Sequence, residues 1–148
     1  MYKKILVPLD GSQRAEAVLR HVEDLALRFG AKVVFLRAVE PASPVAAAEV
    51  AYATLHRQEF ERQVRDAEAY LRVQQGKFRA LGIDVDARVS VGSPVDAIVS
   101  VAEREDVDLV AMASQGRSAF QVFYDSVSAG VLQRIQRPLL VVRGRKRA

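Results

Sequence analysis

The chain has 148 residues, half of them apolar and 27% charged, which is typical of one folded domain and too apolar for a disordered chain. It has no cysteine and two histidines, which excludes disulfides, thiolate metal sites, cysteine nucleophiles and multi-histidine metal centres. The net charge of +4 belongs to Arg143, Arg145, Lys146 and Arg147. Without these four, 18 positive charges balance 18 negative ones, so we do not expect a nucleic-acid-binding surface.

The pattern at the start of the chain does not predict a membrane span or an export signal. No segment approaches the ~18 consecutive apolar residues of a membrane span. Residues 1–4 lead into only a short apolar run, and a signal peptide needs a longer one and a small-residue cleavage site. We therefore expect a cytoplasmic protein that does not partner a membrane.

The first part of the chain predicts a strand over 5–7, a turn over 10–12, a helix over 15–29 and a strand over 32–39. Ile5, Leu6 and Val7 are an apolar run that ends at Pro8. Apolar residues at helical spacing follow, and Gly30 stops the helix. The second strand is β-branched and almost continuously apolar.

The middle of the chain predicts a loop over 41–44, a helix from about 47 to 81 and a strand over 84–91. The last third predicts a helix from 94, a strand over 107–113 and a polar loop over 114–118. A helix around 127–135 and a strand over 139–142 complete the chain. Gly76 predicts a weak point or bend in the long helix. Ser93 is a good N-cap, Pro94 suits the first helical position, and Asp96 suits the positive first turn.

Strands and helices therefore alternate from beginning to end. Apolar strands separated by helices predict a parallel sheet covered on both faces, and right-handed crossovers favour an open, doubly wound α/β fold. We expect three layers with five parallel strands and four helices. Residues 1–143 form one domain in this interpretation, and 144–148 form a basic C-terminal tail.

Ligands of such sheets bind beyond the carboxyl ends of the strands, where the strand order reverses. In the order 3-2-1-4-5, the loops after strands one and four face each other. The first loop holds Asp10, Gly11 and Ser12, which also suit a simple turn with Ser12 capping the next helix. The second loop, around Gly116 and Arg117, offers backbone N–H groups and a cation, a combination that suits phosphate.

Several signatures of nucleotide enzymes and hydrolases are missing. The sequence has no G-x-G-x-x-G, no G-x-x-x-x-G-K-[ST] and no G-x-S-x-G. Neither histidine lies in a loop that follows a strand, and Ser12 stands where an aspartyl-phosphate hydrolase needs a second carboxylate. We therefore expect a binding protein and not an enzyme; hydrolysis of ATP with Asp10 orienting water is a minor alternative.

With both loops in place, the sequence resembles the universal stress protein family over nearly its full length. Residues 4–12 look like its first strand and turn, and 108–142 like its signature half, with the pattern glycine, two residues, glycine, nine residues, then glycine and serine or threonine. The resemblance implies the order 3-2-1-4-5, an adenine nucleotide alpha hydrolase-like fold, a homodimer, and a stress-response protein that binds ATP.

The resemblance also implies a nucleotide site. It places Pro8 and Asp10 beside base and ribose, and the backbone of Val39 at the adenine. The phosphate part corresponds to Ala113, Gly116, Arg117, Ser118, Asp125, Ser126 and Val127.

This sequence departs from the pattern in three ways. Ala113 replaces the first glycine, Asp125 replaces the last, and the stretch between is eight residues (117–124) instead of nine. Three alternatives are open for Asp125: it repels the phosphates, it binds a Mg²⁺ ion that bridges them, or the shortened loop points it outward. The alternative function is therefore a family member without nucleotide that acts as a dimeric interaction module.

The strand over Leu139–Val142 is predicted to lie at the sheet edge. Exposed apolar edges pair, so we expect a homodimer through this strand. The basic tail that follows is either solvated or contacts an anionic partner.

Overall fold

A computed structural model describes residues 1–41, 50–114 and 126–144, with the side chains of 50–52 and 126 left aside. Its five strands form one parallel sheet in the order β3-β2-β1-β4-β5, which confirms the predicted architecture. The elements are β1 (Lys4–Pro8), η1 (Ala15–Val18), α1 (Leu19–Phe29), β2 (Lys32–Val39), α2 (Val50–Ala80), β3 (Val85–Val91), α3 (Pro94–Arg104), β4 (Leu109–Ser114), α5 (Ser126–Arg134) and β5 (Leu139–Arg143).

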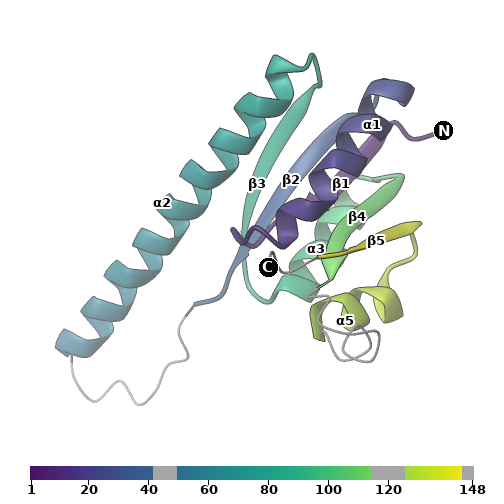
Figure 1. Ribbon diagram of the computed structural model, residues 1–148. Helices are drawn as coiled ribbons and strands as arrows, with labels where there is room; N and C mark the ends of the chain where they lie inside the picture. The colour runs from purple at the N-terminus through teal and green to yellow at the C-terminus, as the bar shows by residue number, and fades with distance from the viewer. Residues whose placement is uncertain (42–49, 115–125, 145–148) are drawn as a thin grey trace.

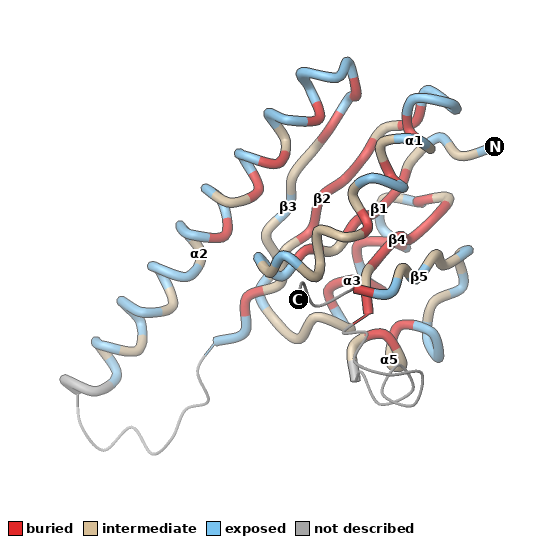
Figure 2. Tube along the Cα trace, in the orientation of Figure 1, coloured by how far each residue is buried: buried red, intermediate tan, exposed pale blue. Residues whose placement is uncertain are grey.

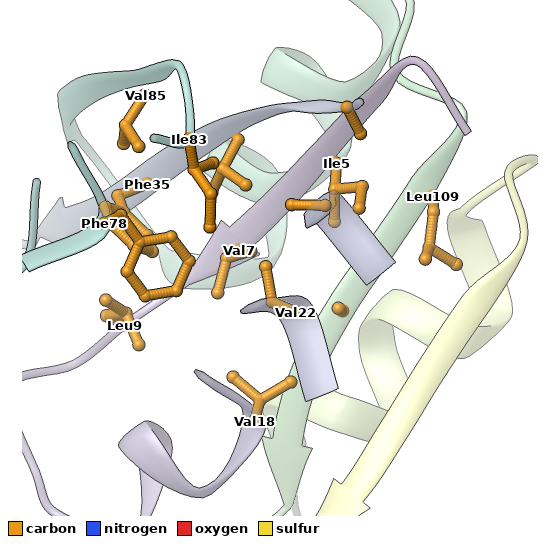
Figure 3. Close-up of a cluster of buried hydrophobic side chains, with 14 of the residues drawn as sticks. Ile5, Val7, Leu9, Val18, Val22, Phe35, Phe78, Ile83, Val85 and Leu109 are labelled. Atoms are coloured by element: carbon orange, nitrogen blue, oxygen red, sulfur yellow. The ribbon is translucent and has the colours of Figure 1, made fainter. Parts of the chain in front are cut away.

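The sheet is the middle of three layers. Helices α1 and α2 cover one face, and α3 and α5 cover the other (Figure 1). The first face is packed with Val22 of α1 and Phe78 of α2, whose ring meets Phe35 of β2 edge-on at 5.0 Å between centroids (Figure 3). Because both faces are covered, β1 is buried on both, as its unbroken apolar run predicts.

The predicted helix ends are present in atomic detail. Ser93 Oγ accepts the N–H of Asp96 at 3.2 Å and caps α3, with Pro94 as its first residue. Gly30 ends α1 in the left-handed conformation, at φ 63°. These helix ends depend only on a capping hydrogen bond and a backbone conformation within one turn of the chain.

Other expectations need correction. Helix α2 runs unbroken through Gly76, because packing against the sheet outweighs the small cost of one helical glycine. The helix predicted from Ala15 begins with the 3-10 turn η1. Phe29, the last residue of α1, is 45% exposed although it belongs to the apolar residues at helical spacing, and it packs edge-on against Tyr2.

Helix α2 is longer than the sheet that it covers. Its fully buried residues are Ala67, Leu71, Gln74 and Phe78. None of its described side chains before Ala67 is buried, and that part of the helix extends beyond the sheet (Figure 2). The described part of the chain has no helix long and apolar enough to cross a membrane.

Candidate functional site

The sheet opens between β1 and β4. The two strands pair only at Ile5–Leu109 and Leu6–Val110, whereas β1 pairs with β2 along its whole length. The Leu9 N–H donates to Leu36 of β2, so the nitrogen of Pro8, one residue earlier, faces β4. Proline has no N–H to donate, and the β1–β4 ladder therefore cannot continue past this point.

A cavity of ≈ 190 Å³ lies where the strands part. This is the carboxyl edge of the sheet, at the reversal of strand order, where doubly wound folds bind their ligands. The described residues that line the cavity are Pro8, Leu9, Asp10, Ala15, Leu36, Ala38, Pro94, Ile98, Met112, Ala113 and Val127. Most of them are apolar, and Asp10 is the charged residue among them.

Asp10 is held by a turn with its own hydrogen bonds. Its Oδ1 accepts the N–H of Ser12 at 2.8 Å, and Ser12 Oγ accepts the N–H of Ala15, the first residue of η1, at 3.1 Å. The turn-and-cap interpretation is therefore right in its geometry, and the same turn places Asp10 at the cavity. A carboxylate accepts several hydrogen bonds, so Asp10 can still accept one from a ligand hydroxyl.

Arg37 supports this turn from the α1–α2 side of the sheet. Gly11 has φ +88°, and a Cβ there would lie 2.9 Å from Nη1 of Arg37. The same guanidinium lies over the Tyr70 ring of α2, 5.3 Å from its centroid. Burial first, and then the charge of Glu16, raise the pKa of the Tyr70 phenol. The phenol is therefore neutral at physiological pH, and the Arg37 cation lies between the aromatic ring and the turn.

Helices α3 and α5, which pack closely against each other, form another wall of the cavity. A Cβ on Gly130 of α5 would lie 2.9 Å from Val95 of α3, so glycine permits the approach. Arg134 of α5 also pairs with Asp96 in the first turn of α3, and this pair lowers the pKa of the Asp96 carboxyl. These contacts bring Pro94 and Val127 to the same cavity.

The structure brings together part of the predicted site. Pro8, Asp10, Ala113 and Val127 all line the cavity. Val39 is buried at the end of β2, does not line the cavity, and accepts the Gly92 N–H through its carbonyl at 3.0 Å. Gly116, Arg117, Ser118 and Asp125 lie outside the described residues, and Ser126 begins α5 without a described side chain.

Sequence reasoning missed the other lining residues, which are apolar. Leu36 and Ala38 of β2 and Met112 of β4 face the cavity, as do Pro94 and Ile98 of α3. Alternation along β2 gives a partial signal, since Leu36 and Ala38 share a face. The contribution of α3 needs the packed structure. In the described ranges, no three His, Asp or Glu side chains form a group that could hold a metal ion.

Comparisons with known proteins agree with this architecture. The model of the universal stress protein family matches residues 1–143. Universal stress protein MJ0577 of Methanocaldococcus jannaschii is 30% identical, over 97% of this chain and 96% of that one. Its solved structure has a TM-score of 0.82, at 28% identity over 100% of this chain and 99% of that one.

Two further solved structures are similar. A universal stress protein in complex with cAMP is 25% identical, over 97% of this chain and 98% of that chain, with a TM-score of 0.71. Universal stress protein UspA from Lactobacillus plantarum is 23% identical and shares the fold, with a TM-score of 0.80 over 96% of this chain and 98% of that one.

Proposed function

Since this chain belongs to the universal stress protein family, we propose that it is a regulatory stress-response protein that binds an adenine nucleotide, with ATP as the preferred ligand, between β1 and β4. The cavity at the parting of these two strands is the observation that carries the proposal. A relative that forms a complex with cAMP supports the adenine nucleotide as the ligand class.

The size of the cavity decides which part of the ligand it holds. A dry cavity of about 150 Å³ accommodates one benzene ring, whereas whole small-molecule pockets run from about 300 Å³ upward. The ≈ 190 Å³ here therefore suits a planar base. Ribose and phosphates then lie at the mouth, and Asp10 is the acceptor for a ribose hydroxyl.

Isothermal titration calorimetry and thermal unfolding with adenosine, ATP, cAMP and GTP test the proposal. ATP should bind and raise the melting temperature, because a ligand that binds only the folded state stabilises it. Asp10→Asn should weaken adenosine and ATP alike by about tenfold, the loss of one charge-assisted hydrogen bond. An unchanged melting temperature at millimolar ATP, with and without Mg²⁺, contradicts the proposal. The runs with Mg²⁺ also test Asp125 as a ligand of a bridging ion.

The second candidate function is an interaction module without nucleotide. The observation that favours it is the Ala113 side chain, which adds a methyl group to the cavity lining. Neither candidate function includes catalysis. The same titration separates them, because the module binds no adenine ligand.

We also propose a homodimer through β5. The two edge strands differ in chemistry. Strand β3 carries Asp86 and Arg88 in ion pairs with Lys32 and Glu105, whereas β5 is apolar over Leu139–Val142 and has one charged residue, Arg143, at its end. Charged edges resist pairing, and apolar edges favour it. Antiparallel pairing of two β5 strands about a two-fold axis would cover the apolar edge.

A further inference from the structure

Arg37 lies on the opposite face of the sheet from the cavity. It stands in β2 between Leu36 and Ala38, which both line the cavity, and successive side chains of a strand point to opposite faces. Its side chain therefore points into the layer between the sheet and helix α2, where it is partly buried. Arg37 does not line the cavity, so any contact with a ligand there has to pass through another residue.

The Arg37 guanidinium contacts two groups that can transmit its effect. A Cβ added to Gly11 would lie 2.9 Å from Nη1, 3.2 Å from Cζ and 3.3 Å from Nη2, so the guanidinium lies directly against the turn over 10–12. Its Cζ also lies 5.3 Å from the centre of the Tyr70 ring in α2, which is a cation–π distance. Arg37 thus connects the turn that carries Asp10 with helix α2.

Two carboxylates share this environment. Asp10 precedes Gly11 in the turn, and Glu16 lies in η1. Burial first, and then the charges of Glu16 and Asp10, raise the pKa of the Tyr70 phenol, whereas the charge of Arg37 lowers it. The phenol is therefore close to all three charges. Loss of the Arg37 cation would leave the two carboxylates to repel each other, which favours a displacement of Asp10.

We propose that Arg37 is a positioning residue of the nucleotide site and that the Tyr70 ring holds it in place. The inference rests on the proposed function and adds the residues that fix the geometry of Asp10. A hydrogen bond weakens steeply away from its best distance and angle, so the position of the turn decides how well Asp10 holds a ribose hydroxyl. Because Tyr70 belongs to α2, the packing of this helix on the sheet and the affinity of the site depend on each other.

Arg37→Met tests the inference, because it keeps an unbranched side chain and removes the charge. Calorimetry should show adenosine and ATP binding weakened by about tenfold, the loss of one charge-assisted hydrogen bond at Asp10. Binding of 2′,3′-dideoxyadenosine should be unchanged, because this ligand lacks the hydroxyls that Asp10 would accept. In an Asp10→Asn background, Arg37→Met should have little further effect, since two residues that act through one contact are not additive.

Variants of Tyr70 test how Arg37 is held. Tyr70→Leu removes the ring and should weaken adenosine binding by about threefold, the loss of a cation–π contact. Tyr70→Phe, the conservative variant, keeps the ring and should restore the affinity. This pair also tests the inference if Arg37→Met does not fold. The matched control for the lost charge is Arg28→Met, an exposed cation in the last turn of α1, which should leave binding within about twofold.

A measurement without ligand separates this inference from the proposed function. The amide hydrogens of Ser12 and Ala15, which make the hydrogen bonds of the turn, should exchange with solvent faster in Arg37→Met than in the unaltered chain; equal rates contradict the inference. Equal weakening of adenosine and dideoxyadenosine, or of neither, overturns it while the adenine site stands. If the unaltered protein binds neither adenosine nor ATP, the proposed function is wrong, and the exchange rates still decide whether Arg37 fixes the turn.

Discussion

Single residues at the carboxyl edge decide the shape of the candidate site. Gly11 shows this most clearly, because it combines a positive φ with a close neighbour, the Arg37 guanidinium. Ala113 is a second such residue, because its methyl group is part of the cavity lining. Each position yields a prediction that depends on local geometry.

Gly11→Ala should lower the free energy of unfolding by about 1–2 kcal/mol, because a Cβ disfavours the left-handed region and would also press on Arg37. Urea unfolding measures the change. Gly76→Ala is the control: it lies inside α2 with nothing within 4 Å of its added Cβ, and should raise stability by about 0.5–1 kcal/mol. If Gly11→Ala raises the free energy of unfolding as Gly76→Ala does, the backbone at Gly11 does not disfavour a Cβ, and the prediction is wrong.

If the nucleotide binds in the cavity, Ala113→Gly should tighten ATP binding by about fivefold, because a methyl group that presses on the ligand costs about 1 kcal/mol. The same change should lower stability by about 0.5–1 kcal/mol, since glycine costs backbone entropy in a strand. Calorimetry and urea unfolding measure the two effects separately. Weaker binding would mean that the alanine methyl contributes contact rather than obstruction.

At the scale of elements, Asp108 joins the beginnings of two strands. Its Oδ2 accepts the N–H groups of Lys3 at 2.8 Å and Lys4 at 2.9 Å. The hydrogen bond from Lys3, followed by that from Lys4, lowers the pKa of this carboxyl. A carboxylate thus fixes the start of β1 against β4, while Pro8 separates the same strands at their other end.

The lowered pKa predicts a pH dependence. The carboxylate stabilises the fold above its unfolded pKa of about 3.9, and this contribution disappears as pH falls through the lower folded pKa. Asp108→Asn should therefore be less stable than the unaltered chain at pH 7, and the difference should shrink towards pH 3. Thermal unfolding across this range measures it. Asp24→Asn, on the exposed side of α1, is the control and should show no such convergence.

On the scale of the whole molecule, the two edge strands of the sheet differ: β3 has charged residues within it, whereas β5 is apolar up to Arg143 at its end. Val141 of β5 is 39% exposed, and Val91 of β3 is 63% exposed. If β5 forms the dimer, Val141→Lys should shift the protein to monomer in sedimentation at micromolar concentration, because an edge lysine opposes strand pairing. Val91→Lys should leave the dimer intact. A monomeric unaltered protein contradicts the proposed assembly.

The sequence alone determined the elements and their order. Buried strands such as 32–39 appear as apolar runs because both faces of a parallel sheet are covered, and helix ends such as Ser93 and Gly30 depend on contacts within one turn. The resemblance to the family grouped Pro8, Asp10, Ala113 and Val127 in one site, and in the structure all four line the cavity.

Only the tertiary structure decided which further side chains line the cavity. Leu36, Met112 and Ile98 reach the cavity because β2, β4 and α3 pack together, which no local pattern encodes. The same holds for Arg37 beneath Gly11. Such contacts join segments far apart in the chain, and their geometry depends on how all the intervening elements pack.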